Sequence, residues 1–233
     1  MLSAILVAAG SSQRMGFDKL FATIAGEPVI THAIRAFDQA ISVSEIIVVA
    51  REDRHDQIQK INRDAGFKKL RSIVAGGERR QDSVRAGLDR VGRGAKFVAV
   101  HDAARPLTTP EQIERAFEQC RVHGAAALAQ PVNDTLKRAD ADLFVTGSVD
   151  RHQLYAMQTP QIFDRDLIDD AYRAVYTQGI WITDEVSAVE RLGHKIALVL
   201  DDDFNFKITY PPDLSVAESI LHDKAKDSQF GRK

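Results

Sequence analysis

The segment 8–19 carries residue types that bind phosphate groups. It opens with three small residues at which a backbone can approach a ligand closely: Ala8, Ala9 and Gly10. Exposed backbone N–H groups in such a turn suit phosphate oxygens. Arg14 and Lys19 follow, so a bound phosphate would also meet a bidentate guanidinium and a mobile ammonium. Without these cations, the small residues would equally fit an ordinary tight turn between a strand and a helix.

Two common nucleotide-binding motifs are absent from this segment. Glycines at 10 and 16 do not form G-x-G-x-x-G, and Lys19 is not adjacent to Gly16 as a Walker loop requires. The second predicted strand ends at Ala50 and Arg51, without the acidic residue that binds the ribose of a dinucleotide. The sequence therefore disfavours a nicotinamide-dependent oxidoreductase.

A second candidate group lies at 101–102, at the end of a strongly apolar predicted strand. Carboxyl ends of parallel strands are where open α/β sheets bind ligands, which makes Asp102 a candidate ligand-binding residue. By itself, Asp102 is also typical of a cap on the following turn, and His101 of a strand-end histidine with satisfied hydrogen bonds. The other histidines lack the spacing of a zinc site. No Ser/His/Asp or Cys/His set indicates covalent catalysis.

The elements that position these residues alternate between short apolar runs and helical patterns, which predicts an α/β fold: a Rossmann-like, mostly parallel sheet with helices on both faces. Strands are predicted at 3–8, 45–50, 70–74, 97–101, 125–130, 154–157, 196–200 and 207–209. Helices are predicted at 28–40, 53–65, 78–91, 109–123, 164–176 and 184–192, and from Pro212 onward. The helix at 109–123 has an N-cap threonine, a proline at N1 and a glutamine at N3.

We predict one domain over 1–233 with two departures from the alternating pattern. A β-arm is predicted at about 132–153, because strand-like segments at 135–138 and 144–149 flank a polar turn. The polar segment at about 224–233 is predicted to be a disordered tail.

Bulk composition excludes several classes of protein. The chain has 31 basic and 33 acidic residues among 233, so it lacks the positive surface that nucleic-acid binding requires. The one cysteine, Cys120, cannot form an internal disulfide and falls on the apolar face of a predicted helix. No apolar run approaches the roughly 18 residues that span a bilayer. We therefore expect a cytoplasmic protein with no membrane partner.

Further motifs make the sequence similar to one family. The segment 8–19 resembles the signature loop of the nucleoside-diphosphate-sugar pyrophosphorylase fold. The other motifs are Gly76-Gly77-Glu78-Arg79-Arg80-Gln81-Asp82-Ser83-Val84, Val100-His101-Asp102-Ala103-Ala104-Arg105-Pro106, Asp134-Thr135-Leu136-Lys137, Val149-Asp150-Arg151, Gln158-Thr159-Pro160-Gln161, Thr183-Asp184-Glu185 and Lys207-Ile208-Thr209. Together they resemble the 2-C-methyl-D-erythritol 4-phosphate cytidylyltransferases, from Ser3 to about Leu221.

The resemblance implies a reaction of the non-mevalonate route to isoprenoid precursors. The phosphate of methylerythritol phosphate attacks the α-phosphorus of CTP, with Mg²⁺ or another divalent cation such as Mn²⁺ bound and pyrophosphate released. The implied catalytic residues are Arg14, Lys19, Arg151 and Lys207. The implied CTP-binding residues are Ala8, Ala9, Gly10, Gly76, Gly77, Ser83, Asp102 and Ala103, and Asp102 would also hold the metal. The implied acceptor-binding residues are Arg105, Thr135, Arg151, Thr159, Thr183, Asp184 and Lys207.

The resemblance also implies a homodimer, in which the arm carries Thr135 and Arg151 to the active site of the neighbouring subunit. The alternative for the arm is a solvent-exposed hairpin. Similarly, 76–83 is either a slot in which cytosine is recognised or an ordinary loop before a capped helix.

Three positions depart from the family pattern. Ser12 stands where many members have a second glycine, which restricts φ. Asp18 stands where a proline is frequent, so the approach of Lys19 is less fixed. Phe204 replaces an acidic residue that some members carry, which leaves Asp203, Asp201 or Asp202 as the alternative carboxylate near the metal.

Two other functions remain open from the sequence. Ribitol 5-phosphate cytidylyltransferases share the CTP half of the site and differ in the acceptor pocket. A non-catalytic nucleotide-binding module would use the same loop without turnover.

Overall fold

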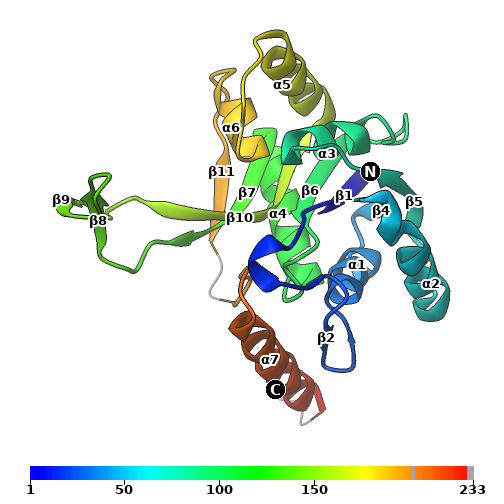
Figure 1. Ribbon diagram of the computed structural model, residues 1–233. Coiled ribbons are helices and arrows are strands. Elements are labelled where there is room, and N and C mark those ends of the chain that lie inside the picture. The colour runs from blue at the N-terminus through cyan, green and yellow to red at the C-terminus, as the bar shows by residue number, and fades with distance from the viewer. Residues whose placement is uncertain (201–202, 230–233) are drawn as a thin grey trace.

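A seven-stranded sheet runs through the centre of the molecule, with strands in the order β11-β7-β10-β6-β1-β4-β5 (Figure 1). The computed structural model describes residues 1–200 and 203–229. β10 is antiparallel to its neighbours β6 and β7, and the other neighbouring pairs are parallel. The strand bounds are β1 Leu2–Ala8, β4 Val43–Ala50, β5 Leu70–Ala75, β6 Phe97–Asp102, β7 Ala125–Pro131, β10 Tyr155–Asp164 and β11 Ala197–Leu200.

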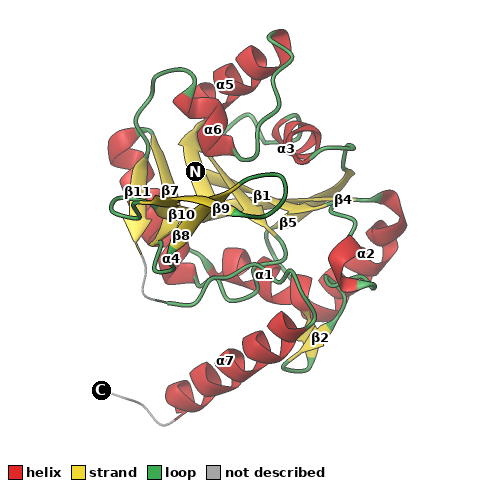
Figure 2. Ribbon diagram, turned by 60° about the vertical axis from the view of Figure 1, so that its left-hand side comes forward, coloured by secondary structure: helices red, strands yellow, loops and turns green. Residues whose placement is uncertain are grey.

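Helices cover both faces of this sheet, as the sequence predicts (Figure 2). On one face lie α1 (Val29–Gln39), α2 (His55–Ala65) and α4 (Pro110–His123), and on the other α3 (Arg80–Leu88), α5 (Arg165–Thr177) and α6 (Glu185–Glu190). Each layer has its own hydrophobic core, because central strands such as β4 bury side chains on both faces. The α/β prediction is confirmed.

The final helix, α7 (Pro212–Gln229), builds a third, smaller core beside the sheet. Its Ala217 packs with Met15 of the phosphate-binding segment and with Ile24 of a short hairpin, β2 (Thr23–Ile24) and β3 (Glu27–Pro28). This core fixes the far end of the segment 8–19 against the rest of the domain.

The start of α4 agrees with its sequence signals. Thr109 and Gln112 form a reciprocal capping box, and the helix ends at Gly124 with a φ of 78°. Cys120 is fully buried on this helix, and burial raises the pKa of its thiol to about 12, as suits a core residue.

Several predicted elements differ from the structure. α3 begins at Arg80, because Arg79 and Asp82 cap it there, and ends at Leu88, inside the predicted range 78–91. β10 continues to Asp164 beyond the predicted end, although its pairing with β7 is interrupted around Pro160, which has no N–H to donate. Residues 207–209 form no strand. α7 runs to Gln229, so a disordered tail from Lys224 is contradicted as far as that residue, and 230–233 lie outside the described residues.

The predicted arm is a two-stranded antiparallel hairpin of β8 (Leu136–Ala139) and β9 (Val145–Val149). It projects far from the body of the domain (Figure 1). Within 1–200 and 203–229, the chain has no helix of the length and hydrophobicity needed to cross a membrane.

Candidate active site

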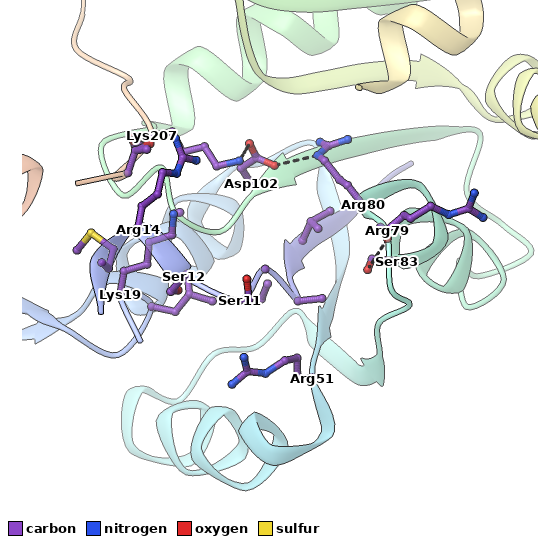
Figure 3. A pocket seen from close by; sticks show the side chains of 18 of the residues that line it. Ser11, Ser12, Arg14, Lys19, Arg51, Arg79, Arg80, Ser83, Asp102 and Lys207 are labelled. Atoms are coloured by element: carbon purple, nitrogen blue, oxygen red, sulfur yellow. Dashed lines mark hydrogen bonds and ion pairs between the residues drawn. The ribbon is translucent and has the colours of Figure 1, made fainter. Parts of the chain in front are cut away.

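A cleft of about 700 Å³ opens at the carboxyl ends of β1 and β6 (Figure 3). Six basic and two acidic side chains of the described chain line it, so the cleft suits an anionic ligand. The charged lining residues are Arg14, Lys19, Arg51, Arg79, Arg80, Lys207, Glu78 and Asp102. Ala8, Ala9, Gly10, Gly77 and Ser83 also line it, which brings most of the predicted CTP-binding residues together.

The loop after β1 presents Arg14 and Lys19 to this cleft. A short 3-10 helix, Gln13–Met15, carries Arg14, whose guanidinium lies over the Tyr210 ring at 5.4 Å from its centroid. Lys19 donates from Nζ to the Ile208 carbonyl oxygen at 2.6 Å. Burial and the nearby Lys207 and Arg14 cations lower the pKa of the Lys19 ammonium. A bound polyphosphate would relieve the repulsion among these cations.

Asp102 lies between cations from two distant parts of the chain (Figure 3). Lys207 Nζ contacts its Oδ2 at 2.8 Å, and Arg80 Nε contacts its Oδ1 at 3.3 Å. Burial raises the pKa of this carboxyl, but Arg80, Lys207 and Arg105 outweigh that effect and hold the pKa well below its usual range. Asp102 therefore stays ionised at neutral pH.

Arg80 is a cleft residue to which sequence reasoning assigned no role. Its Nη1 donates to Glu185 Oε1 at 2.5 Å, and Glu185 is fully buried at the start of α6. Tyr172 donates to the same carboxylate oxygen at 2.9 Å. Burial lowers the pKa of Arg80, but Glu185 and Asp102 outweigh it and raise the pKa, so the guanidinium is held charged in the cleft. In the sequence, a cationic role for Arg80 was indicated only by the adjacent arginines Arg79 and Arg80 after Gly76-Gly77.

The segment 76–83 packs directly against the phosphate-binding loop. A Cβ placed on Gly76 would lie 2.5 Å from Ala9 Cβ and 2.9 Å from Ser83 Oγ, so only glycine fits there. Ser83 Oγ accepts from the Gly77 N–H at 3.2 Å and donates to the Arg79 carbonyl at 3.2 Å. The segment is thus a shaped edge of the cleft as well as the capped start of α3.

His101 and Thr159 form a buried scaffold behind the cleft. The Thr159 hydroxyl accepts from the Asp102 N–H at 3.1 Å and lies 3.0 Å from His101 Nδ1. Burial lowers the pKa of His101 to about 3, so its imidazole is neutral. Asn205 donates to the Thr159 carbonyl at 2.9 Å. His101 is thus the satisfied strand-end histidine that the sequence allowed.

Ala103 and Arg105 follow Asp102, but both are more buried than their predicted ligand-binding roles require. Ala103 is fully buried, and Ala104 lines the cleft in its place. The Arg105 side chain is 11% exposed and donates to the Asn205 carbonyl at 2.6 Å. Neither Ala103 nor Arg105 lines the cleft.

Thr183 and Asp184 are at the start of α6. Asp184 caps this helix by accepting from the Ser187 N–H at 3.0 Å, and it also accepts from Gln161 Nε2 at 2.9 Å. Neither residue lines the cleft. Thr135 and Arg151 belong to the arm segment 132–153, where Arg151 donates to the Asn133 carbonyl. Neither residue lines the cleft of its own chain, and the arm strands β8 and β9 project from the domain (Figure 1).

The three departures from the family pattern have structural outcomes. Ser12 adopts a left-handed conformation with φ 55°, which glycine takes without strain. Asp18 forms an ion pair with Arg54 at 2.6 Å. Asp203 is an ion-pair partner of Lys224 at 3.9 Å and does not line the cleft. Asp201 and Asp202 lie outside the described residues.

Comparison with known proteins agrees with this geometry. The family model described as 2-C-methyl-D-erythritol 4-phosphate cytidylyltransferase matches residues 2–223. A relative of that name from Caldanaerobacter subterraneus is 43% identical over 94% of this chain and 98% of its own, and one from Halalkalibacterium halodurans is 37% identical over 96% and 98%.

Solved structures give the same result. The 4-diphosphocytidyl-2C-methyl-D-erythritol synthase of Anaerococcus prevotii superposes with a TM-score of 0.84 at 29% identity, covering 95% of this chain and 96% of its own. The 2-C-methyl-D-erythritol 4-phosphate cytidylyltransferase of Thermus thermophilus superposes with a TM-score of 0.76 at 27% identity, covering 94% and 98%. Because model, relatives and structures all match over nearly the whole chain, this protein belongs to the 2-C-methyl-D-erythritol 4-phosphate cytidylyltransferase family.

Proposed function

We propose that this chain transfers the cytidylyl group of CTP to 2-C-methyl-D-erythritol 4-phosphate, giving 4-diphosphocytidyl-2-C-methyl-D-erythritol and pyrophosphate in the non-mevalonate pathway. The observation that carries the proposal is the convergence of Arg14, Lys19 and Lys207 on one cleft around Asp102. Family membership supplies the substrates, because the relatives are named for methylerythritol phosphate. The same finding does not favour a ribitol phosphate acceptor.

The chemistry needs positive charge more than it needs a base. An oxygen of the acceptor phosphate forms a bond to the α-phosphorus of CTP, and the bond from that phosphorus to the bridging oxygen of the β-phosphate breaks. The attacking phosphate is already deprotonated at neutral pH, so no proton has to be removed. Negative charge gathers on the five-coordinate phosphorus and on the leaving pyrophosphate, where preorganised cations stabilise the transition state. Arg14 and Lys19 are the cations we assign to this role.

We assign to Lys207 and Arg151 the binding of the attacking phosphate. Lys207 lies across the cleft beside Asp102 and is 39% exposed, so its ammonium is accessible to a second anion. Arg151 lies on the arm and would act in the neighbouring subunit.

The cleft fits a Mg²⁺ ion that arrives with the nucleotide. Mg²⁺ is commonly held by one or two carboxylates together with substrate phosphates, and Asp102 supplies one ionised carboxylate at the cleft floor. Among the described residues no cluster of three metal-ligating side chains forms a site independent of substrate. When bound, the ion would neutralise phosphate charge, and Asp102 would exchange part of its contact with Arg80 and Lys207 for the metal.

The homodimer and the cytoplasmic location remain proposals. The arm supports dimerisation, because a lone two-stranded hairpin is marginally stable and this one exposes apolar side chains. Leu143, Phe144 and Val145 are 86%, 71% and 66% exposed. Thr135 and Arg151 would gain a role only if the arm met a second copy.

Lys19→Ala is the direct test of the proposed function. Removal of one preorganised cation should lower kcat by about 100-fold, because a donor to the transition state is worth roughly 3 kcal/mol. The measurement is pyrophosphate release with CTP, Mg²⁺ and methylerythritol phosphate. Arg173→Ala, which removes an exposed cation on α5, is the matched control and should keep wild-type turnover.

Two results would contradict the proposal. Faster turnover of ribitol 5-phosphate by the wild type would assign the other acceptor. Undiminished turnover in Arg14→Ala and Lys19→Ala would remove the role of the loop cations.

A further inference from the structure

Arg54 is a buried arginine that contacts the nucleotide-binding loop without lining the cleft. It ends a 3-10 turn, Glu52–Arg54, directly after β4, and its side chain is 2% exposed. Burial of a guanidinium is unfavourable unless it is paired and hydrogen-bonded. A fully buried arginine at this place therefore needs a set of strong partners.

All three guanidinium nitrogens of Arg54 have such a partner, and each partner belongs to the loop. Nη1 donates to the Ala8 carbonyl, and Nη2 donates to the Gly10 carbonyl at 2.9 Å. Nε donates to Asp18 Oδ2 at 2.6 Å. The planar fork of arginine holds these three acceptors in one fixed arrangement, which the ammonium of lysine cannot do.

The two carbonyl contacts set the direction of backbone N–H groups. In a trans peptide the C=O of one residue and the N–H of the next point in opposite directions. A carbonyl held by Arg54 therefore also orients the amide of the following residue, which is Ala9 for Ala8 and Ser11 for Gly10. Both of these residues line the cleft, where such amides would meet the triphosphate.

The Asp18 contact acts on the residue next to it, Lys19. Asp18 Oδ2 accepts from Arg54, while Oδ1 accepts from the Leu20 N–H at 3.2 Å. The backbone on both sides of Lys19 is thus tied to one carboxylate. This pairing supplies the restraint that a proline at position 18 would otherwise give through its fixed φ.

We propose that Arg54 and Asp18 are a positioning pair: Arg54 orients the loop amides that bind the triphosphate, and Asp18 holds Lys19 where it stabilises the transition state. The inference rests on the proposed function for its catalytic readout. It predicts separate effects, on nucleotide affinity for Arg54 and on turnover for Asp18.

Asp18→Asn tests whether Asp18 positions Lys19. The change is made both in the wild type and in Lys19→Ala. The change keeps the side-chain shape and an acceptor for Leu20, and removes the charge that Arg54 contacts at 2.6 Å and Arg51 approaches at 4.0 Å. We expect kcat to fall about tenfold or more, since small misplacement of a catalytic group has effects of this size, while KM for CTP changes less than about threefold. In a Lys19→Ala background the same change should lower kcat by less than about twofold. Equal losses in both backgrounds would overturn the proposal, because they would show a merely structural role.

Asp170→Asn is the matched control for this experiment. Asp170 is also a carboxylate paired with an arginine, but its partner is Arg173 at 2.7 Å, and both are exposed on α5, away from the cleft. It should leave kcat, KM and the unfolding midpoint unchanged. Thermal unfolding of each variant establishes that it is folded at the assay temperature.

Arg54→Lys tests whether Arg54 orients the loop amides, by measurements that do not depend on turnover. Calorimetric titration with CTP and Mg²⁺ should show at least tenfold weaker binding, and amide hydrogen exchange of 9–12 should become faster than in the wild type and in Asp170→Asn. Wild-type values for both measurements would overturn the role of Arg54. If the wild type gives no product from CTP and methylerythritol phosphate, the proposed function fails, whereas titration and exchange still decide whether Arg54 orients the loop.

Discussion

Gly76 shows how one missing side chain shapes the cleft. A methyl group at this position would overlap Ala9 Cβ at 2.5 Å and Ser83 Oγ at 2.9 Å, and Ala9 Cβ cannot move without its backbone. Gly76→Ala should therefore lower the free energy of unfolding by about 1–3 kcal/mol and weaken CTP binding by displacing the loop. Urea unfolding and CTP titration measure the two effects.

Gly10→Ala is the comparison, because a Cβ at Gly10 meets no atom within 4 Å. Its unfolding free energy should stay within about 1 kcal/mol of wild type, and an equal loss in both variants would contradict the steric explanation.

His101, near the end of β6, should make the unfolding free energy of the protein depend on pH. Burial lowers the pKa of His101 to about 3, whereas the histidine titrates near 6.5 in the unfolded chain. Between these values the unfolded state binds one more proton, so the unfolding free energy should fall as pH drops from 6.5 toward 3, by up to about 1.4 kcal/mol per pH unit. Above pH 6.5 this contribution is complete. His101→Gln should flatten the slope between pH 4 and 6, measured by urea unfolding. His32, whose pKa burial also lowers, is present in both proteins and cancels. An unchanged slope would show that His101 is not held neutral.

The arm relates two copies of the whole molecule in the proposed dimer. If Arg151 acts in the neighbouring cleft, Lys19→Ala and Arg151→Ala place their defects in different halves of one composite site. Equal mixing should then restore about a quarter of wild-type activity, since half of the dimers are mixed and each has one intact site. Pyrophosphate release after mixing is the measurement. Mixing Lys19→Ala with Arg14→Ala is the control and should restore nothing, because both residues line the same cleft. Failure of the first mixture to recover, with subunit exchange shown by light scattering, would place Arg151 outside the site.

Much of this molecule could be predicted because its signals are local. Apolar periodicity gave the layered α/β fold, and the capping residues Thr109 and Gln112 located the start of α4. Boundaries were missed where a neighbour decides the structure. Residues 207–209 have strand-like composition but no strand beside them, and the Ile208 N–H instead bonds to the Ala104 carbonyl at 2.9 Å. β10 continues beyond Pro160 because β6 and β7 flank it.

The sequence alone determined the chemistry of the cleft: small residues after β1, the cations Arg14 and Lys19, and a carboxylate at the end of β6. Residue type and chain order contain that information, since a strand end and the turn after it are formed by neighbouring residues. Only the tertiary structure decided which cations share a carboxylate. Arg80 reaches Glu185 across 105 residues, and Arg54 reaches Asp18 across 36. Such pairs depend on strand order and on which helices face each other, and these are set by packing of the whole chain.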